Sequence, residues 1–264
     1  MQWTLLFIYL LFLVFRLWLR HLNLQHLQRH GHEVPAGFVG VVDPQLLAKT
    51  SDYTVAISRL GLIESLFGSL LLLIFLFGGL IDWYDSWIRA LTASFVGQGV
   101  LFVLGLTLVQ AILDIPFSLY RTFVLEARFQ FNTSTPRLWL TDQLKSLAVG
   151  CLLLALITAG ALALVQASPQ GWWLWVWGFL GLITLLLMYL SPVLIEPLFF
   201  KFQPLQKQEL ADRVKAVMGQ TGLQVDRVQQ VDASRRSKHS NAYFTGIGRV
   251  KRIVLFDTLL EQMT

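Results

Sequence analysis

Long apolar runs alternate with short polar segments along the first 195 residues. The five runs that we identify lie at residues 3–19, 62–81, 95–117, 147–167 and 172–195. An apolar helix of about 18 or more residues is long enough to cross the hydrocarbon core of a bilayer. The pattern therefore predicts five transmembrane helices.

Composition supports this interpretation. Hydrophobic residues make up 55% of the 264 residues, charged residues only 14%, and the mean hydropathy is +0.59. A soluble domain cannot bury so much apolar surface, so we expect an integral membrane protein. The first run is followed by charged residues and has no small-residue cleavage motif, which favours a membrane anchor over a removed signal peptide.

Basic residues in the loops predict the orientation. Lys and Arg are frequent after the first, third and fifth runs, whereas the second loop has only Arg89 and the fourth, residues 168–171, has neither. Because cytoplasmic loops are enriched in Lys and Arg, we expect an N-terminus outside and a tail after residue 195 in the cytoplasm. The net charge of +5 is then a topology signal, and no nucleic-acid partner is expected.

The composition changes near residues 191–204, where three prolines are spaced through the sequence. Beyond them the pattern predicts an amphipathic helix at 208–221 and strands at 228–231, 241–245 and 252–256. Gly246 and Gly248 indicate a hairpin between the last two strands. Thr258 and Glu261 fit a capping box at the start of a further helix. We therefore divide the chain into a membrane region, 1–196, and the start of a cytoplasmic domain, 197–264.

The chain offers few residues for catalysis or metal binding. His26 and His30 have the i, i+4 spacing of helical metal ligands, but they directly follow a membrane run, where polar residues are common. The sequence contains no H-E-x-x-H motif, and Cys151 is its single cysteine. Asp114 and Glu196 lie near the ends of two runs, so each could be interfacial or line a polar cavity.

The densest polar cluster is residues 234–246, "SRRSKHSNAYFTG". Alternation places Ala242 and Phe244 on one face of the strand and Asn241, Tyr243 and Thr245 on the other. The segment is either a charged surface loop before a hairpin or an edge strand that pairs with an extended peptide. In the second case backbone groups supply the affinity and the Asn241 amide fixes the register.

Three segments resemble one known family. They are "FVLEARFQFNTSTPRLWLTDQLK" (123–145), "LIEPLFFKFQPL" (194–205) and "SRRSKHSNAYFTGIGRVKRIVLFDTLLEQ" (234–262). Together, in this order, they are similar to segments of the type 1 CAAX prenyl proteases, a family of multi-pass membrane zinc endopeptidases. The resemblance covers roughly residues 117–262. The first two runs resemble the family only in their general apolar character.

The resemblance implies an all-α membrane protein, with five of the family's seven helices here, followed by the start of an α+β cytoplasmic metalloprotease domain. In the family the helices enclose a water-filled chamber. A strand that pairs with the substrate backbone corresponds to Asn241, Ala242, Tyr243 and Phe244. The H-E-x-x-H helix and a further Glu ligand follow later in the family. We therefore expect the N-terminal part of a zinc enzyme, inactive alone, with no catalytic or metal-binding residue in this chain.

The implied partners are a peptide or prenylated-peptide substrate, the lipid bilayer and the remaining C-terminal portion of the same protein. A fragment of this kind is expected to aggregate, because Ile253, Leu255, Leu259 and Leu260 would have little to bury against. One alternative is a non-catalytic membrane protein that binds peptides or lipidated chains. Another is a small transporter, but the sequence lacks the internal symmetry or paired broken helices typical of that class.

Overall fold

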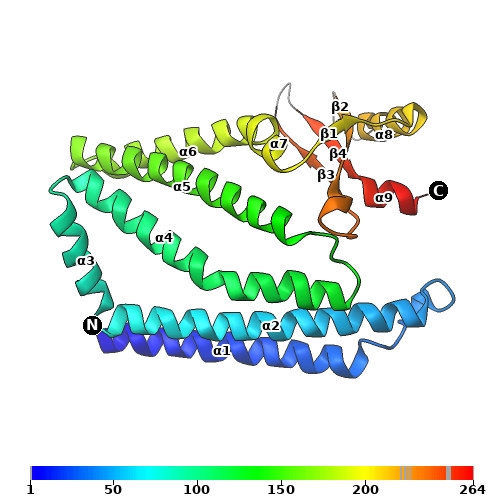
Figure 1. The fold of residues 1–264 in the computed structure, drawn as a ribbon, viewed down its shortest axis with the longest axis horizontal. Coiled ribbons are helices and arrows are strands. Elements are labelled where there is room, and N and C mark those ends of the chain that lie inside the picture. Colours follow the sequence, from blue (N-terminus) through cyan, green and yellow to red (C-terminus); the bar gives the residue numbers. More distant parts are fainter. Residues whose placement is uncertain (1, 221, 223–224, 226, 248–250, 264) are drawn as a thin grey trace. The chain divides into compact units, whose positions relative to one another are not determined.

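The computed structural model describes residues 2–220, 222, 225, 227–247 and 251–263, and the structural statements below concern these residues (Figure 1). Five of its helices are long and apolar enough to cross a membrane. They are α1 (Gln2–His30), α2 (Pro44–Phe77), α4 (Phe95–Leu119), α5 (Pro136–Ala167) and α6 (Trp172–Leu190). The five predicted spans are thus confirmed as helices.

Several of these helices are longer than the apolar runs that predicted them. The 34 residues of α2 extend over about 51 Å, whereas the hydrocarbon core of a bilayer is about 30 Å thick. The predicted end of this span at residue 81 is wrong. The helix stops at Phe77, where Gly78 donates its N–H to the Ile74 carbonyl (2.8 Å) and Gly79 has a φ of +79°. A short amphipathic helix that we did not predict, α3 (Leu80–Leu91), follows.

Two membrane helices continue into π-helical turns, which we also did not predict. Segment η2 (Tyr120–Glu126) follows α4, whose last turns contain Pro116. Segment η3 (Ser191–Ile195) follows α6, contains Pro192 and leads into the short helix α7 (Glu196–Phe199). Proline cannot donate to the helical ladder, and π-turns are frequently found at functional sites.

The chain forms two compact units. The first comprises the residues up to Trp87 together with Asp114–Phe129. In it α1 lies alongside α2 (Figure 1), and Arg16 donates to the Ser65 hydroxyl across the pair at 2.6 Å. A 3-10 turn, η1 (Ala36–Phe38), lies in the connection between the two helices.

The second unit contains Ile88–Leu113 and the chain from Gln130 onward. Here α5 and α6 lie side by side (Figure 1). Gly160 permits this close approach, because a Cβ at that position would lie 2.5 Å from the Phe179 ring. Helix α5 begins with Pro136 in its first turn, and the Thr135 hydroxyl accepts the Leu138 N–H at 3.2 Å.

A four-stranded sheet follows in the same unit, in the order β1-β2-β4-β3. The strands are β1 (Phe202–Pro204), β2 (Arg227–Val231), β3 (Ala242–Thr245) and β4 (Arg252–Phe256). The last three confirm predicted strands, whereas β1 was not predicted. The antiparallel β3–β4 pairing agrees with the expected hairpin, although Gly248 lies outside the described residues.

One face of the sheet is covered by helix α8 (Gln208–Gln220), which confirms the predicted amphipathic helix; Thr221 lies outside the described residues. Ile253 and Leu255 are each 8% exposed and pack in a cluster with Ala211 and Val228. Leu259 and Leu260 pack against the same cluster. Our expectation that these four residues would have little to bury against was therefore wrong, because α8 supplies the missing apolar surface.

The last helix, α9 (Asp257–Gln262), begins one residue before the predicted cap. The capping box is also wrong: the Thr258 hydroxyl donates to the His239 carbonyl at 2.9 Å instead of capping the helix. The Asp257 carboxylate accepts the N–H groups of Thr258 and Ser234 at 2.9 Å each. Ser234 belongs to a 3-10 turn, η4 (Ala233–Arg235), so these bonds attach α9 to the polar cluster that precedes β3.

Candidate functional site

Strand β3 lies at one edge of the sheet, with β4 on one side and no further described strand on the other (Figure 1). Ala242 and Phe244 are exposed, whereas Tyr243 and Thr245 are half-buried. The predicted alternation is thus present, and Phe244 keeps 43% of its surface exposed. An exposed edge strand can pair with another extended chain.

The register shows which backbone groups are available at this edge. The Phe256 N–H donates to the Asn241 carbonyl at 3.0 Å, and Tyr243 lies opposite Val254. Because the N–H and C=O groups of successive residues in a strand point to opposite sides, those of Ala242 and Phe244 point away from β4. The Asn241 side chain already accepts the Ala242 N–H at 2.8 Å.

A buried polar cluster supports the inner face of β3. The Tyr243 hydroxyl donates to Glu196 Oε2 at 2.9 Å, and Arg252 Nη2 donates to the same oxygen at 2.8 Å. Arg252 also donates to Gln229 Oε1 at 2.9 Å, and its guanidinium lies 4.1 Å from the centre of the Phe202 ring. The cluster connects β1, β2, β3 and β4 to the first residue of α7, just beyond a membrane helix.

Burial raises the pKa of Tyr243, and the hydrogen bond to the Glu196 carboxylate raises it further. The positive charge of Arg252 lowers this pKa but does not outweigh the other effects. The hydroxyl therefore stays protonated near neutral pH and remains a donor to Glu196. This arrangement holds β3 in place through its inner face and leaves its outer edge open.

The basic segment before β3 is tied to the membrane helices. Arg236 forms two hydrogen bonds to the Asp142 carboxylate in α5, at 2.7 and 3.0 Å, and donates to the Phe199 carbonyl of α7 at 2.6 Å. Its guanidinium lies 4.6 Å from the centre of the Phe200 ring. A bidentate guanidinium–carboxylate pair fixes orientation as well as distance. Arg236 is thus part of the internal structure rather than of a solvated loop.

The loop before α5 also contacts the basic segment that precedes β3. Phe131 accepts the Lys238 N–H at 2.9 Å, and its ring stacks on His239 with centroids 4.4 Å apart. The Thr133 hydroxyl donates to the Ser234 carbonyl at 2.6 Å. Two of the three segments that we singled out in the sequence therefore lie together in space, on the approach to β3.

The other candidate residues do not converge on one centre. The His26 and His30 rings are 4.8 Å apart on α1, and His30 Nδ1 lies 3.2 Å from a Glu33 oxygen. Asp114 is exposed in the last turns of α4. No three His, Cys, Asp or Glu side chains of the described residues form a group that could hold a metal. A catalytic zinc requires three protein ligands, so the described part of the chain does not fit such a site.

Sequence reasoning considered Glu196 as an interfacial or cavity-lining carboxylate and missed its contacts with Tyr243 and Arg252. These partners are separated from it by 47 and 56 residues. The signal that could have found them is chemical: a carboxylate at the end of an apolar run requires donors from elsewhere in the fold.

Comparison with known families identifies the architecture. Residues 23–201 match the family described as CAAX prenyl protease N-terminal, five membrane helices, and residues 204–264 match Peptidase family M48. The chain belongs to the CAAX prenyl protease family. Its membrane helices match the N-terminal region of this family, and its sheet lies in the part that matches a metallopeptidase family. This confirms the resemblance noted in the sequence.

Individual members of the CAAX prenyl protease family agree with this assignment. The chain is 31% identical over 87% of its length to CAAX prenyl protease 1 homolog of Arabidopsis thaliana. It is 38% identical over 66% of its length to CAAX prenyl protease 1 of Saccharomyces cerevisiae. The crystal structure of S. mikatae Ste24p superimposes with a TM-score of 0.87 at 30% identity, over 96% of this chain.

The chain spans only part of these CAAX prenyl protease relatives. It matches 56% of the Arabidopsis protein, 39% of the Saccharomyces protein and 60% of the solved chain. The fold and the family membership are therefore established for these 264 residues. The activity of the longer relatives as whole proteins is therefore a proposal for this chain.

Proposed function

We propose that this chain forms the chamber wall and the substrate-pairing strand of a membrane zinc endopeptidase, which cleaves C-terminal CAAX-type prenylated peptides or other membrane-associated peptides. The observation that carries the proposal is the open edge of β3 in a chain of the CAAX prenyl protease family. In the proposed organisation residues 1–196 form the membrane region and residues 197–264 begin the protease domain on the cytoplasmic side.

In this proposal each residue of the edge has a distinct role. Ala242 and Phe244 offer backbone N–H and C=O groups to an extended substrate, because their backbone groups point away from β4. The Asn241 side-chain oxygen accepts the Ala242 N–H at 2.8 Å, and on binding this N–H donates to a substrate carbonyl instead. Tyr243 anchors the strand through Glu196. The exposed Phe244 ring offers apolar contact to a substrate side chain.

A matched pair of substitutions tests the pairing. Phe244→Pro removes one of the two outward N–H groups while leaving the bonds of Tyr243 to β4 intact, and proline is tolerated at sheet edges when its missing N–H faces outward. Phe244→Ala removes the ring but keeps the N–H. Binding of a farnesylated peptide with a C-terminal CAAX sequence is measured by photo-crosslinking to the purified chain.

We expect Phe244→Pro to weaken binding about tenfold, which corresponds to one hydrogen bond of about 1.4 kcal/mol. Phe244→Ala should weaken it clearly less. Equal losses for the two variants would show that the ring, and not the backbone, recognises the peptide. Unchanged binding in both variants would overturn the assignment of β3 as the substrate strand.

The zinc ligands are proposed to come from a polypeptide segment other than these 264 residues, namely a C-terminal portion of the same protein. The proposal rests on the missing H-E-x-x-H motif and on the donor set of the described residues, which supplies no group of three ligands. The role of this chain is then to bind and orient the peptide. Zinc, when bound to the complete enzyme, supplies the activated water that attacks the peptide carbonyl.

This proposal predicts that the purified chain contains no stoichiometric zinc and does not hydrolyse the farnesylated peptide. Intact mass, elemental analysis and peptide hydrolysis are measured on the same preparation. A preparation in which a second polypeptide accompanies one zinc per complex would support a split enzyme. One zinc per chain together with hydrolysis, at a mass of 264 residues only, would contradict the proposal.

A further inference from the structure

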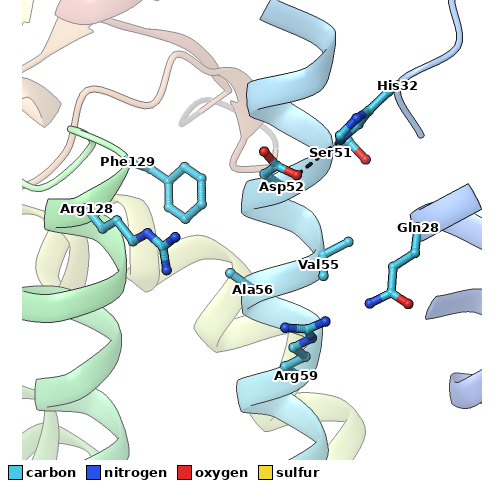
Figure 2. A pocket seen from close by; sticks show the side chains of 9 residues that line it. All are labelled: Gln28, His32, Ser51, Asp52, Val55, Ala56, Arg59, Arg128 and Phe129. Atoms are coloured by element: carbon cyan, nitrogen blue, oxygen red, sulfur yellow. Dashed lines mark hydrogen bonds and ion pairs between the residues drawn. The ribbon is translucent and has the colours of Figure 1, made fainter. Parts of the chain in front are cut away.

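The first unit contains a pocket of about 380 Å³ between α2 and the segment that follows η2 (Figure 2). It is lined by Arg59, Arg128, His32 and Ser51, among others. Figure 2 shows Arg128 extending from its helix toward α2, the helix that carries Arg59. Both arginines are exposed.

A second pocket, of about 480 Å³, continues from the first. The two share four lining residues, Ala56, Arg59, Arg128 and Phe129, so they are contiguous. The lining of the second pocket is otherwise apolar or aromatic and includes Leu60, Ile63, Pro116, Phe117, Tyr120 and Val124. Together the pockets form an amphipathic groove, with a basic mouth and an apolar floor.

The groove is part of the regular structure of this unit. Its α2 residues Ala56, Leu60 and Ile63 have the i, i+4, i+7 spacing of one helix face. Hydrogen bonds hold α2 against η2 on both sides of the groove. The Tyr53 hydroxyl donates to Glu126 at 2.6 Å, and Arg121 donates to both oxygens of Glu64 at 2.6 and 2.7 Å.

The groove carries a positive charge that the described residues do not neutralise. Neither Arg59 nor Arg128 forms an ion pair among the described residues, in contrast to Arg121 with Glu64. The single carboxylate in the mouth, Asp52, lies 3.1 Å from His32 Nε2. The Ser51 side chain is buried at 5% exposure, and its hydroxyl has no hydrogen-bond partner among the described residues. The mouth is therefore suited to an anion.

The level of the groove in the membrane indicates the source of that anion. Arg59 stands immediately before the apolar residues of α2, and Arg128 follows the apolar run of α4 by a few turns. Arginines at the ends of apolar runs lie at the height of the lipid headgroups. The apolar floor continues from there along residues that would face acyl chains.

We propose that this groove binds one anionic phospholipid. Arg59 and Arg128 hold the phosphate, and an acyl chain lies along Leu60, Ile63 and Val124. A free phosphate would use only the mouth, and a zwitterionic lipid would bring its own cation close to two arginines. This inference is independent of the substrate role proposed for β3, because it concerns the other unit of the chain.

The test uses the full 264-residue chain in detergent and native mass spectrometry with two lipids that have identical acyl chains, phosphatidylglycerol and phosphatidylcholine. The double variant Arg59→Gln/Arg128→Gln removes the basic mouth. Arg213→Gln is the control, since it removes one exposed charge from α8, which belongs to the other unit and lines neither pocket. Ile63→Trp fills the floor and leaves the mouth unchanged.

We expect the wild-type chain to bind phosphatidylglycerol tightly and the double variant to bind it about twenty-fivefold more weakly, since each of the two basic side chains near an anionic lipid contributes about fivefold. Arg213→Gln should retain the affinity, and Ile63→Trp should lose it. Millimolar inorganic phosphate should not displace the lipid. Equal binding of the two lipids, full retention by the double variant, or displacement by phosphate would each overturn the proposal.

Discussion

At the scale of single residues, one oxygen of Glu196 accepts hydrogen bonds from Tyr243 and Arg252, at 2.9 and 2.8 Å. Glu196 and Arg252 keep only 20% and 10% of their side-chain surfaces exposed. A buried carboxylate is stable only when its oxygens are satisfied, and removal of one partner leaves an uncompensated group. The two donors come from adjacent strands, so this carboxylate fixes β3 and β4 relative to α7.

The raised pKa of Tyr243 gives a pH dependence that can be measured. Tyr243→Phe removes a donor to a charged acceptor and should lower the free energy of unfolding by about 2 kcal/mol at pH 7 to 9. Tyr243 has a higher pKa in the folded chain than in the unfolded one. Its contribution is therefore complete below the usual tyrosine pKa of about 10 and is lost as the pH rises through the higher folded value.

The difference in stability between wild type and Tyr243→Phe should thus be constant between pH 7 and 9 and shrink above about pH 10. Denaturation of the purified chain in detergent, followed by circular dichroism at several pH values, provides the comparison. Subtracting the variant's free energy of unfolding from that of the wild type at each pH cancels the contributions of all other titrating groups. A difference that persists unchanged to pH 11 would show that the Tyr243 hydroxyl is not held by Glu196.

At the scale of elements, the sequence pattern predicted the parts whose information is local. Apolar runs predicted all five membrane helices, and the pattern after residue 204 predicted β2, β3 and β4, with period-2 alternation identified at residues 241–245. The sequence pattern did not predict elements that depend on a partner distant in the sequence. Strand β1 has only three residues, Phe202–Pro204, and exists because it pairs with Arg227–Val231. The π-turns after α4 and α6 depend on hydrogen-bond register, which composition does not record.

The candidate site likewise has local features that could be predicted from the sequence and long-range contacts that could not. The edge strand and its alternation could be predicted from residues 241–245, because side-chain direction in a strand is a local property. Which backbone groups point outward follows only from the register with β4. The bidentate pair of Arg236 with Asp142 joins residues 94 apart in the sequence. A charged surface loop therefore stayed one of the two alternatives for the basic residues before β3, although one of them, Arg236, is an internal anchor.

At the scale of the whole molecule, the distribution of basic residues argues for one orientation in the membrane. Positively charged loops face the cytoplasm. Arg121, Arg128, Arg137 and Lys145 lie between α4 and the membrane part of α5, whereas residues 168–171 between α5 and α6 carry no charge. We propose that residues 168–171 are outside and that the sheet is cytoplasmic, which would allow the edge of β3 to meet cytoplasmic peptides.

Cysteine labelling tests this orientation, because the chain has a single cysteine, Cys151, which lies within α5. In a Cys151→Ser background, Gln170→Cys and Gln206→Cys each introduce one exposed thiol, in the α5–α6 loop and before α8. We expect a membrane-impermeant maleimide to label Gln170→Cys in intact cells and Gln206→Cys only after permeabilisation. The cysteine-free background controls for nonspecific labelling. The reverse pattern would place the sheet outside the cell, and an enzyme that processes cytoplasmic peptides could then not use the edge of β3.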